Sequence, residues 1–554
     1  MCGIWAVFGA LVDVDTTKHH ETSAKITHRG PDAWRTECDN RMKNGCFSFH
    51  RLSINDGLCG MQPMKRNINP HLTLLCNGEI YNCKRLRDEF NFTYESKCDV
   101  ECILHLYTKL GAKQAASMLD GVFAFCLVDA LNRRVLIARD PFGVRPLFKL
   151  TGPGGVLGVC SEAKGLIKLM EGHDDWKMDP FPPGCFEEYE LNPEGGATFL
   201  RQQRFYSIGD KPHYKLAIQE KDYADDIYTN IRSLLTTAVE KRLMSDRRIG
   251  CLLSGGLDSS LVAALLVKLA KDAGVQYKVQ TFSIGMGEES PDLVAARRVA
   301  AHIGSEHHEV VFTEEDVRSV LDSVLYHLEI ADITTLRASI PMFLLSKYIK
   351  EKTDSTVIFS GEGADEVAQG YIYFRDAPSA EEAHQESLRL LNELYIYDVL
   401  RSDRATSAHS LEVRVPFLDH QFTSYYLSLP KELRQPQKGV EKFILRKAFD
   451  GDLLPHDILW RHKEAFSDGV ASKKKPLFKI LQESVEALVN DEQVQEASKR
   501  FPHCTPKTKE AFYYRQVFDK NFPGQDHWLP YFWMPRWSDA TDPSAQFISH
   551  YAAE

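Results

Sequence analysis

The chain has 554 residues, which is too long for one hydrophobic core, so we expect two to four domains. Hydrophobic residues make up 43% and charged residues 26% of the chain, as in an ordinary soluble globular protein. The formal net charge of −10, without a long basic run, argues against nucleic acid and anionic membranes as partners. No uncharged apolar run reaches the ~18 residues that a membrane-spanning helix needs.

The start of the chain and its cysteines indicate the cellular compartment. The N-terminus has neither a basic region nor a long apolar run, so no signal peptide is expected. None of the 13 cysteines belongs to a Cys-x-x-Cys pair, which favours free thiols over a disulfide framework or a zinc site. We therefore expect a reducing, cytosolic location.

Cys2 is the first residue with a potential chemical role. A small residue at this position permits removal of Met1, after which Cys2 would carry both a thiol and a free α-amine. An α-amine titrates near ~8, so an unprotonated fraction can act as a base at neutral pH. One residue would then supply nucleophile and base together. Taken alone, an incidental cysteine is the simpler interpretation.

The N-terminal part of the chain predicts mostly strands. Residues 72–76 form a strand candidate, and the Asn-Gly pair at 77–78 is first of all typical of a type I′ hairpin turn. Residues 122–128 and 135–138 predict a second hairpin, and apolar residues at helical spacing predict a helix over 100–110. Strands with few helices indicate an α+β domain with antiparallel sheets.

Several short strings in this part resemble the glutaminase domain of class II glutamine amidotransferases. Their order and spacing are far more specific than any one string. The resemblance implies an N-terminal-nucleophile (Ntn) fold, which is an α+β sandwich of antiparallel sheets. The strings are Cys2-Gly3-Ile4, the polar turn His28-Arg29-Gly30-Pro31-Asp32, His50-Arg51-Leu52, Asn77-Gly78-Glu79, and Arg139-Asp140 followed by Gly143-Val144-Arg145-Pro146-Leu147.

The same resemblance implies roles for six of these residues and their neighbours. Cys2 would hydrolyse glutamine through a thioester. The side-chain amide of Asn77 and the backbone N–H of Gly78 would form the oxyanion hole, where two neutral donors meet the developing charge. Glutamine itself would be bound through its α-carboxylate and its α-ammonium group. The glutamine-binding residues implied are Arg51, whose guanidinium suits a carboxylate, and Asn77, Gly78, Glu79 and Asp99.

A polar stretch over 207–220 marks the predicted linker, and beyond it strands and helices alternate. The pattern predicts strands at 279–284, 307–311 and 356–360, with helices through 303 and over 314–328. Alternating strands and helices indicate a doubly wound α/β domain, with a parallel sheet and helices on both faces. Ligands bind at the carboxyl ends of such strands.

One such strand end carries the string Ser254-Gly255-Gly256-Leu257-Asp258-Ser259-Ser260. The apolar run 249–253 before it predicts a strand, and the leucines after it have helical spacing. Glycines allow a ligand close to the backbone, and free N–H groups at a helix start attract anions. The string has no Gly-Lys-Ser/Thr ending, so it is a phosphate cradle but not a Walker loop. A well-capped turn is the alternative interpretation.

This string resembles the pyrophosphate-binding loop of ATP pyrophosphatases, which have an adenine nucleotide alpha hydrolase-like fold. Further strings extend the resemblance over nearly the whole chain to glutamine-dependent asparagine synthetases, with a tail similar to the animal form. These strings are Asp332-Ile333-Thr334-Thr335, Ser360-Gly361-Glu362-Gly363-Ala364-Asp365-Glu366, Leu411 through Asp419, Lys463-Glu464-Ala465-Phe466 and Trp533-Met534-Pro535.

The resemblance implies that ATP and Mg²⁺ activate aspartate as β-aspartyl-AMP, releasing pyrophosphate, and that ammonia from glutamine then gives asparagine. Glu362 would act in forming or consuming the adenylate, for example as a base on the attacking ammonia. The remaining implied residues are Leu253, Ser254, Gly255, Gly256, Asp258, Ser259, Ile284, Ser360, Gly361 and Lys463 for ATP and pyrophosphate, Thr334, Thr335 and Arg337 for aspartate, and Asp258 and Asp365 for the metal.

The expected domains are a glutaminase over 2–206, the linker 207–220, an ATP-pyrophosphatase domain over 221–540 and a tail over 541–554. Two alternatives remain open. One is an amidotransferase with another acceptor, such as a sugar phosphate, although such enzymes lack the Ser-Gly-Gly-x-Asp-Ser loop. The other is a non-enzymatic binding module. The oligomeric state stays open as well, with a homodimer as one candidate.

Overall fold

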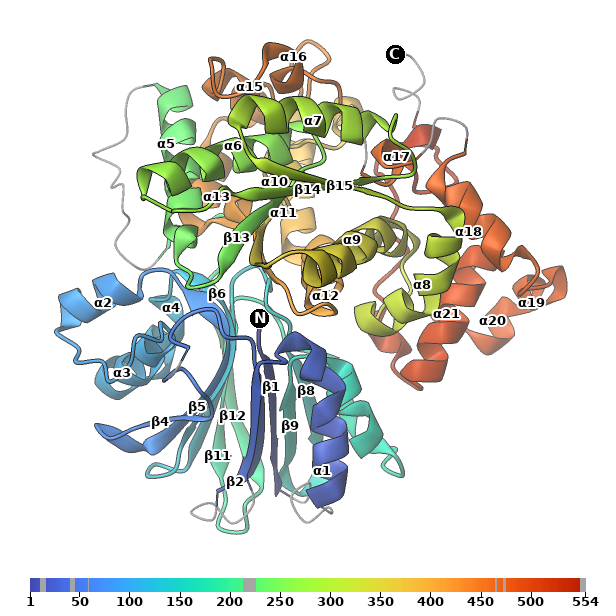
Figure 1. Cartoon of the computed structure of the whole chain (residues 1–554). Coiled ribbons are helices and arrows are strands. Elements are labelled where there is room, and N and C mark those ends of the chain that lie inside the picture. The colour runs from blue at the N-terminus through green and yellow to red at the C-terminus, as the bar shows by residue number, and fades with distance from the viewer. Residues whose placement is uncertain are drawn as a thin grey trace. The chain divides into compact units, whose positions relative to one another are not determined.

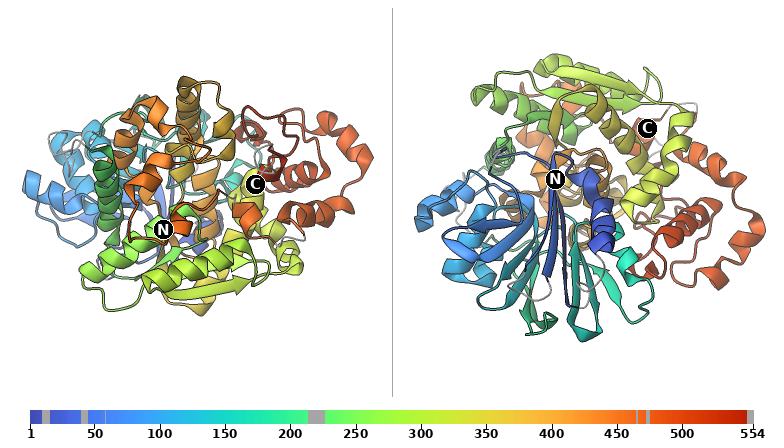
Figure 2. Two further views of the ribbon diagram at one scale, coloured as in Figure 1. Left: turned by 90° about the horizontal axis from the view of Figure 1, so that it is seen from above. Right: turned by 60° about the horizontal axis from the view of Figure 1, so that its bottom comes forward.

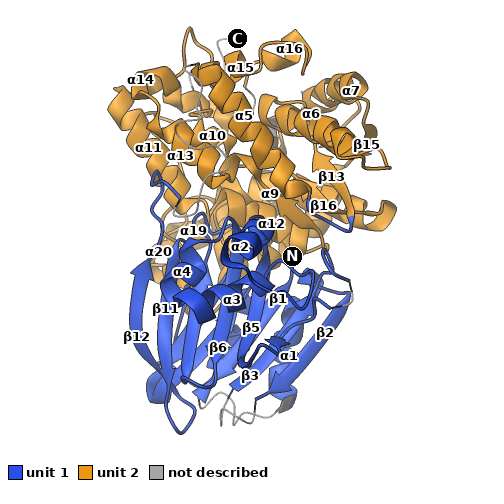
Figure 3. Cartoon of the chain, turned by 90° about the vertical axis from the view of Figure 1, so that its left-hand side faces the viewer, with its two compact units in different colours: residues 1–216, 244–247 blue, residues 217–243, 248–554 orange. Residues whose placement is uncertain are grey.

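The computed structural model describes residues 1–9, 16–39, 45–57, 59–212, 226–463, 466–471 and 475–548. The chain divides into two compact units (Figure 3). The first comprises residues 1–216 with 244–247, and the second comprises residues 217–243 with 248–554. Most of the predicted linker, from residue 213 on, lies outside the described residues. Within the described part, no helix is both long and apolar enough to span a membrane.

The first unit contains two six-stranded antiparallel sheets, with strand orders β10-β8-β9-β1-β3-β2 and β12-β11-β7-β6-β5-β4 (Figure 1). Their elements are β1 (Gly3–Phe8), α1 (Thr16–Ser23), β2 (Ala33–Cys38), β3 (Gly45–Arg51), β4 (Met64–Arg66), β5 (Asn69–Ile80), α2 (Cys83–Phe90), α3 (Glu101–Leu110), α4 (Ala112–Ser117), β6 (Gly121–Asp129), β7 (Arg134–Arg139), β8 (Phe148–Gly152), β9 (Val156–Cys160), β10 (Lys177–Pro180), β11 (Cys185–Leu191) and β12 (Ala197–Arg204).

Alternation of side chains explains how the two sheets pack. Ile4, Ala6 and Phe8 of β1 point to one face, where they join Leu75 of β5 and Ala124 of β6 in a buried cluster. Since β1 belongs to one sheet and β5 and β6 to the other, this cluster is the core between the sheets. The predicted antiparallel sandwich and the hairpin of β6 and β7 are confirmed.

The predicted turn at Asn77-Gly78 is wrong, because both residues lie inside β5. Asn77 pairs with Ala124 and Gly78 with Phe123 of β6. A Cβ on Gly78 would lie 2.5 Å from the carbonyl oxygen of Val122, so the glycine serves close strand approach rather than turn geometry. The polar turn predicted over residues 28–32 is only partly confirmed, because residues 28 and 29 end a 3₁₀ helix over Ala24–Arg29.

We expect Gly78→Ala to destabilise the first unit by about 1–3 kcal/mol, because the added methyl group overpacks β5 against β6. Thermal unfolding followed by circular dichroism measures this loss. Gly57→Ala is the matched control, since a Cβ at Gly57 would meet no atom within 4 Å. Equal unfolding temperatures for the two variants would contradict the packing argument.

The second unit is built on one parallel sheet of order β15-β14-β13-β16-β17. Its elements are α5 (Ile227–Glu240), β13 (Arg248–Leu252), α6 (Leu257–Asp272), β14 (Gln280–Gly285), α7 (Pro291–Ile303), β15 (Glu306–Val311), α8 (Glu314–Leu328), α9 (Ile333–Lys352), β16 (Ser355–Phe359), α10 (Ala364–Val367), α11 (Ala380–Glu393), α12 (Asp398–Ser407), β17 (Glu412–Arg414), α13 (His420–Ser428), α14 (Lys431–Arg434), α15 (Phe443–Ala448), α16 (His456–Leu459), α17 (Phe466–Gly469), α18 (Leu477–Glu486), α19 (Asp491–Gln495), α20 (Ala497–Arg500) and α21 (Lys509–Asn521).

Helices cover both faces of this sheet, as the alternating pattern predicted. Helices α6 and α7 lie on one face, and α9 and α12 lie on the other (Figure 1). The later helices α18 and α21 pack beside α8 (Figure 2). The carboxyl ends of β13, β14 and β16 therefore open at one edge of the sheet, where the predicted cradle begins.

Two candidate active sites

Cys2 lies at the start of β1 in the first unit, beside β5. Its backbone nitrogen lies 2.9 Å from Oδ1 of Asn77, and its Sγ lies 3.6 Å from the carbonyl oxygen of Leu52. Met1 is present, so this nitrogen is a peptide N–H that stands in for the α-amine expected after removal of Met1. In either state Asn77 accepts the hydrogen bond and holds the nitrogen beside the thiol.

The side-chain amide of Asn77 is placed to act as an oxyanion donor. Asn77 is fully buried, and its Nδ2 has no hydrogen-bond partner among the described residues. Because Oδ1 is held by the nitrogen of Cys2, the amide presents its NH₂ group elsewhere. An unpaired buried donor costs free energy, so its presence beside a nucleophile favours a role in binding charge.

The backbone of β5 supplies the second predicted donor. Cys76 and Ile80 direct their N–H groups to Gln62 Oε1 and Asp99 Oδ2, both at 2.6 Å, on the side of β5 away from β6. N–H directions alternate along a strand, so Gly78 directs its N–H to the same side. The strand thus presents the Asn77 amide and the Gly78 N–H from adjacent residues.

Arg51, Glu79 and Asp99 are buried close to these donors, with exposed fractions of 6%, 4% and 5%. The guanidinium of Arg51 donates to the carbonyl oxygens of residues 55, 56 and 57, which fix its orientation. Nδ2 of Asn55 donates to Glu79 Oε2 at 2.7 Å, so the same loop holds the glutamate. A fixed cation and two fixed carboxylates suit an α-amino acid.

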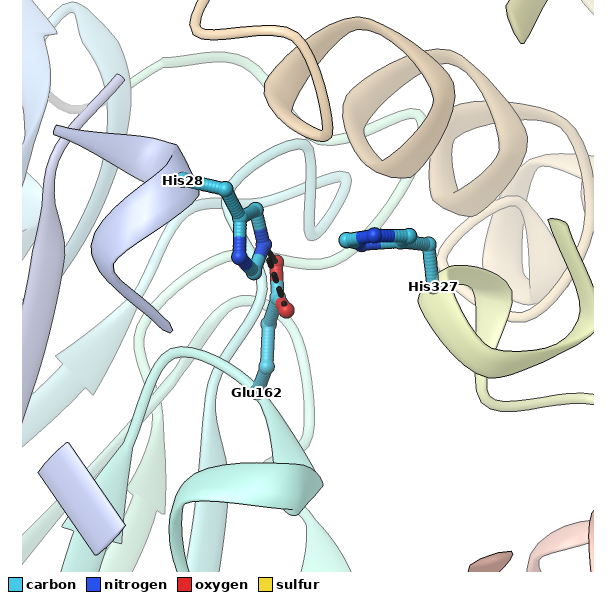
Figure 4. Close-up of side chains that lie close together, drawn as sticks. All are labelled: His28, Glu162 and His327. Atoms are coloured by element: carbon cyan, nitrogen blue, oxygen red, sulfur yellow. Dashed lines mark hydrogen bonds and ion pairs between the residues drawn. The ribbon is translucent and has the colours of Figure 1, made fainter. Parts of the chain in front are cut away.

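The polar string at 28–32 positions the nucleophile through a buried glutamate. Glu162 accepts a hydrogen bond from His28 at 3.0 Å (Figure 4). It accepts another from Arg29 at 2.6 Å. Nε of Arg29 in turn donates to the carbonyl oxygen of Cys2 at 3.1 Å. Lys164 also pairs with Glu162 at 2.5 Å. The motif therefore holds the backbone of the chain start through Arg29.

In the second unit, the predicted phosphate cradle has the expected strand, turn and helix. β13 ends at Leu252, α6 begins at Leu257, and Gly256 is the N-cap residue. Gly255 has φ +76°, and a Cβ there would lie 2.5 Å from Ala295 and Ala296 of α7. Only glycine fits at position 255 without strain, whereas Gly256 has an ordinary φ of −72°.

A cavity of about 250 Å³ lies at this edge of the sheet. It brings together side chains from three strand ends, the start of α9 and the segment before α17. Of the predicted residues, those that line it are Leu253, Ser254, Gly256, Asp258, Ser259, Ile284, Thr334, Thr335, Ser360, Gly361, Glu362, Asp365 and Lys463. Gly255 is the turn residue behind the cradle.

Two carboxylates and two lysines form one charged cluster in this cavity. Lys442 Nζ lies 2.5 Å from both Asp258 Oδ2 and Asp365 Oδ1, and Lys463 Nζ lies 2.6 Å from Asp365 Oδ2. Burial opposes ionisation of Asp365, but the two lysines hold the pKa of its carboxyl below the ordinary value. The second oxygen of Asp258 is buried without a partner in the described part of the chain.

These carboxylates fit Mg²⁺ by donor chemistry. Magnesium prefers carboxylate oxygens together with oxygens of a bound phosphate. Asp258 and Asp365 stand beside the cradle, and the unpartnered oxygen of Asp258 is the atom left for a cation. Lys442 and Lys463 would offset the negative charge of phosphates bound in the same cavity.

Glu362 follows the end of β16 and forms a buried ion pair on one side of the cavity. Its Oε2 lies 2.6 Å from Nη2 of Arg401, which also lies 3.0 Å from Asp398. Burial raises the pKa of Glu362 above its ordinary value, although attraction by Arg401 opposes the shift. A carboxyl group with a raised pKa in a cavity is a candidate for proton transfer.

Arg337 is the predicted residue that the structure places apart from this cavity. Its guanidinium makes hydrogen bonds of 2.6–2.9 Å to Glu510 and to Asp542. These contacts use its donors to hold the C-terminal part of the second unit. That Arg337 binds aspartate stays a prediction, with this geometry favouring a supporting role.

Sequence reasoning missed Lys442, Arg401 and Asp398. Lys442 is 2% exposed in its side chain and contacts Asp258 across 184 positions of the sequence. No local motif marks such a lysine. Only the folded chain shows that Lys442 is the N-cap residue of α15, with φ +55°.

Comparisons with known proteins find a matching family for each part of the chain. The family model described as asparagine synthase matches residues 230–382 and 375–547, and the model described as glutamine amidotransferase domain matches residues 1–189. The chain is 56% identical to the glutamine-hydrolysing asparagine synthetase of Gallus gallus, and 55% identical to those of Bos taurus and Homo sapiens. Each alignment covers 100% of this chain and 99% of the relative.

Proposed function

Because the chain belongs to the family of glutamine-hydrolysing asparagine synthetases, we propose that it makes asparagine from aspartate and glutamine, with ATP converted to AMP and pyrophosphate. One observation carries the synthetase half of this proposal. The cradle, the acidic residues Asp258 and Asp365 and the glutamate Glu362 come from two separate segments and line one cavity. ATP-dependent activation of a carboxylate needs these groups in one place.

In the glutaminase half, the Cys2 thiolate attacks the amide carbon of glutamine, and the neighbouring nitrogen takes the thiol proton once it is a free amine. Negative charge then develops on the amide oxygen. Nδ2 of Asn77 and the N–H of Gly78 stabilise it by donating hydrogen bonds. Arg51 orients the α-carboxylate, and Glu79 and Asp99 receive the α-ammonium. Ammonia leaves, and water releases glutamate from the thioester.

In the synthetase half, the cradle N–H groups and the two lysines bind the phosphates of ATP. Asp258 and Asp365 would hold Mg²⁺, which when bound neutralises charge on the departing pyrophosphate. Thr334 and Thr335 orient aspartate, whose side-chain carboxylate attacks the α-phosphorus. Ammonia then replaces AMP at the activated carbonyl, and Glu362 accepts a proton from the attacking nitrogen.

The finer assignments form part of the proposal. The glutaminase is taken to span 2–206 and the synthetase 221–540. We propose a cytosolic enzyme that acts on small molecules without nucleic acid or membrane, and a homodimer is one candidate assembly.

A test of the whole reaction uses glutamine labelled in its side-chain amide, together with aspartate and ATP. We expect the label in asparagine, and one pyrophosphate for each asparagine. Pyrophosphate release that does not depend on aspartate would point to another acceptor. Absence of any turnover by the folded, processed chain would favour the non-enzymatic alternative.

We expect Asp258→Asn to lower aspartate-dependent pyrophosphate release at least about tenfold with either nitrogen source, because a ligand charge beside Mg²⁺ is lost. Glutamine hydrolysis should persist, since its residues lie in the other unit. Asp272→Asn, at the exposed end of the same helix α6, is the control. Wild-type synthesis by Asp258→Asn would remove this carboxylate from the site.

A further inference from the structure

The segment after α21 takes part in a second cavity beside the synthetase cavity. We name residues 530–548 the C-terminal strap. The second cavity has a volume of about 100 Å³ and is mostly apolar. Four residues line both cavities, so the two adjoin one another. They are Thr334, Tyr371, Lys463 and Trp533, and the last of these belongs to the strap.

Ion pairs and aromatic contacts hold the strap in place. Asp542 pairs with the buried Arg337 at 2.6 Å, which anchors its far end. Trp533 and Trp537 pack against a buried cluster that contains residues 372–374. The ring of Trp533 lies 6.2 Å from that of Tyr371 and 6.1 Å from that of Tyr373. The strap is therefore an ordered wall of this part of the unit.

A single buried carboxylate connects Trp533 to the start of α9. Oδ2 of Asp332 accepts hydrogen bonds from the backbone N and the hydroxyl of Thr335, each at 2.9 Å. Oδ1 of the same side chain accepts the backbone N–H of Trp533 at 3.1 Å. Asp332 thus caps the helix with one oxygen and fixes the strap with the other.

This connection matters because Thr334 and Thr335 line the cavity in which aspartate would be activated. An acyl-adenylate reacts with water as well as with ammonia, so a synthetase site must exclude water until ammonia arrives. Trp533 lines both cavities and offers a large ring where they adjoin.

We propose that the C-terminal strap completes the synthetase site, with Trp533 shielding the aspartyl-adenylate from water and Asp332 positioning Trp533 against Thr334 and Thr335. This proposal rests on the proposed function. Without the shield, water attacks the activated carbonyl carbon, the bond from that carbon to the phosphate oxygen breaks, and the products are aspartate and AMP. ATP is then consumed without asparagine.

The test measures AMP formed per asparagine in the full-length enzyme, with ammonia as nitrogen source. The variants are Trp533→Ala and Asp332→Ser, since a serine keeps the N-cap of α9 but has no second oxygen for the strap. Trp533→Phe is the conservative variant. Asp539→Asn is the matched control on the strap, because the side chain of Asp539 is exposed.

We expect the ratio of AMP to asparagine to rise about threefold or more in Trp533→Ala and Asp332→Ser, to return toward one in Trp533→Phe, and to stay at one in the control. Heavy-oxygen water should place its label in the recovered aspartate. A purely structural defect would lower both products together and leave the ratio unchanged.

An unchanged ratio in both variants would overturn the proposal, and a rise in Trp533→Ala alone would overturn the role of Asp332. Failure of the proposed function gives a different result, in which the wild type itself forms no AMP in response to aspartate.

Discussion

Replacing Cys2 by alanine will abolish asparagine synthesis from glutamine and leave synthesis from ammonia intact. Without the thiolate no thioester forms, so we expect the glutamine-dependent rate to fall by roughly three orders of magnitude or more. The synthetase cavity lies in the other compact unit and contains none of the glutaminase residues. Added ammonia should therefore still attack the activated aspartate.

Assays of the purified variant with each nitrogen source measure this asymmetry. Cys59→Ala, which removes an exposed thiol of the same unit, is the control. Mass spectrometry of the wild type should show that Met1 is absent, because a retained Met1 blocks the amine that serves as base. Glutamine-dependent synthesis by Cys2→Ala, or full activity of a chain that keeps Met1, would overturn the assignment of the nucleophile.

Glu362→Gln will reduce synthesis with both nitrogen sources by about 100- to 10,000-fold, the usual contribution of a general base. Glutamine has almost the same shape as glutamate, so the cavity and its contact with Arg401 should be kept. Glutamine hydrolysis at Cys2 should continue. Product analysis measures the loss, and Glu351→Gln on the exposed end of α9 is the control. Near-wild-type synthesis with an unchanged unfolding transition would exclude a catalytic role for Glu362.

The pH dependence of the wild type should report the same carboxylate. Burial raises the pKa of Glu362, so the proton is held to a higher pH than in an ordinary glutamate. A base must be deprotonated, and synthesis should therefore decline as the pH falls through this raised pKa. The measurement needs a constant concentration of unprotonated ammonia. An acid limb at the ordinary pKa of glutamate would contradict this role.

The same raised pKa has the opposite consequence for folding. A carboxyl group that prefers its proton in the folded chain contributes stability below its ordinary pKa, and this contribution declines as the pH rises through the raised value. Asp365 behaves in reverse, because its lowered pKa adds stability that is lost as the pH falls through that value. The contributions of Glu362 and Asp365 to folding stability therefore change in opposite directions with pH.

Local patterns in the sequence predicted much of the fold and of both sites. The strand, turn and helix around Ser254 follow from an apolar run, two glycines and helical spacing, all within about 20 residues. The helix over Glu314–Leu328 begins and ends at its predicted residues, because a capping box at Thr313 marks its start. Signals of this kind depend only on residues that are close together in the chain, so they can be recognised in a single sequence.

Asn77-Gly78 shows where local reasoning fails. An Asn-Gly pair alone favours a tight turn, but pairing with β6 along the whole of β5 overrides this preference. The resemblance predicts both residues as oxyanion donors, and this role stays a prediction. Only the folded strand shows how adjacent residues present a side-chain amide and a backbone N–H together.

By itself, the sequence determined the fold classes and the family, and it predicted 13 of the residues that line the synthetase cavity. The tertiary structure decided which charges meet. It placed Lys442 between Asp258 and Asp365, paired Arg401 with Glu362, and directed Arg337 to the C-terminal strap. The physical reason is that a buried charge takes its pKa and its role from partners within a few ångströms, and folding brings those partners from positions far apart in the chain.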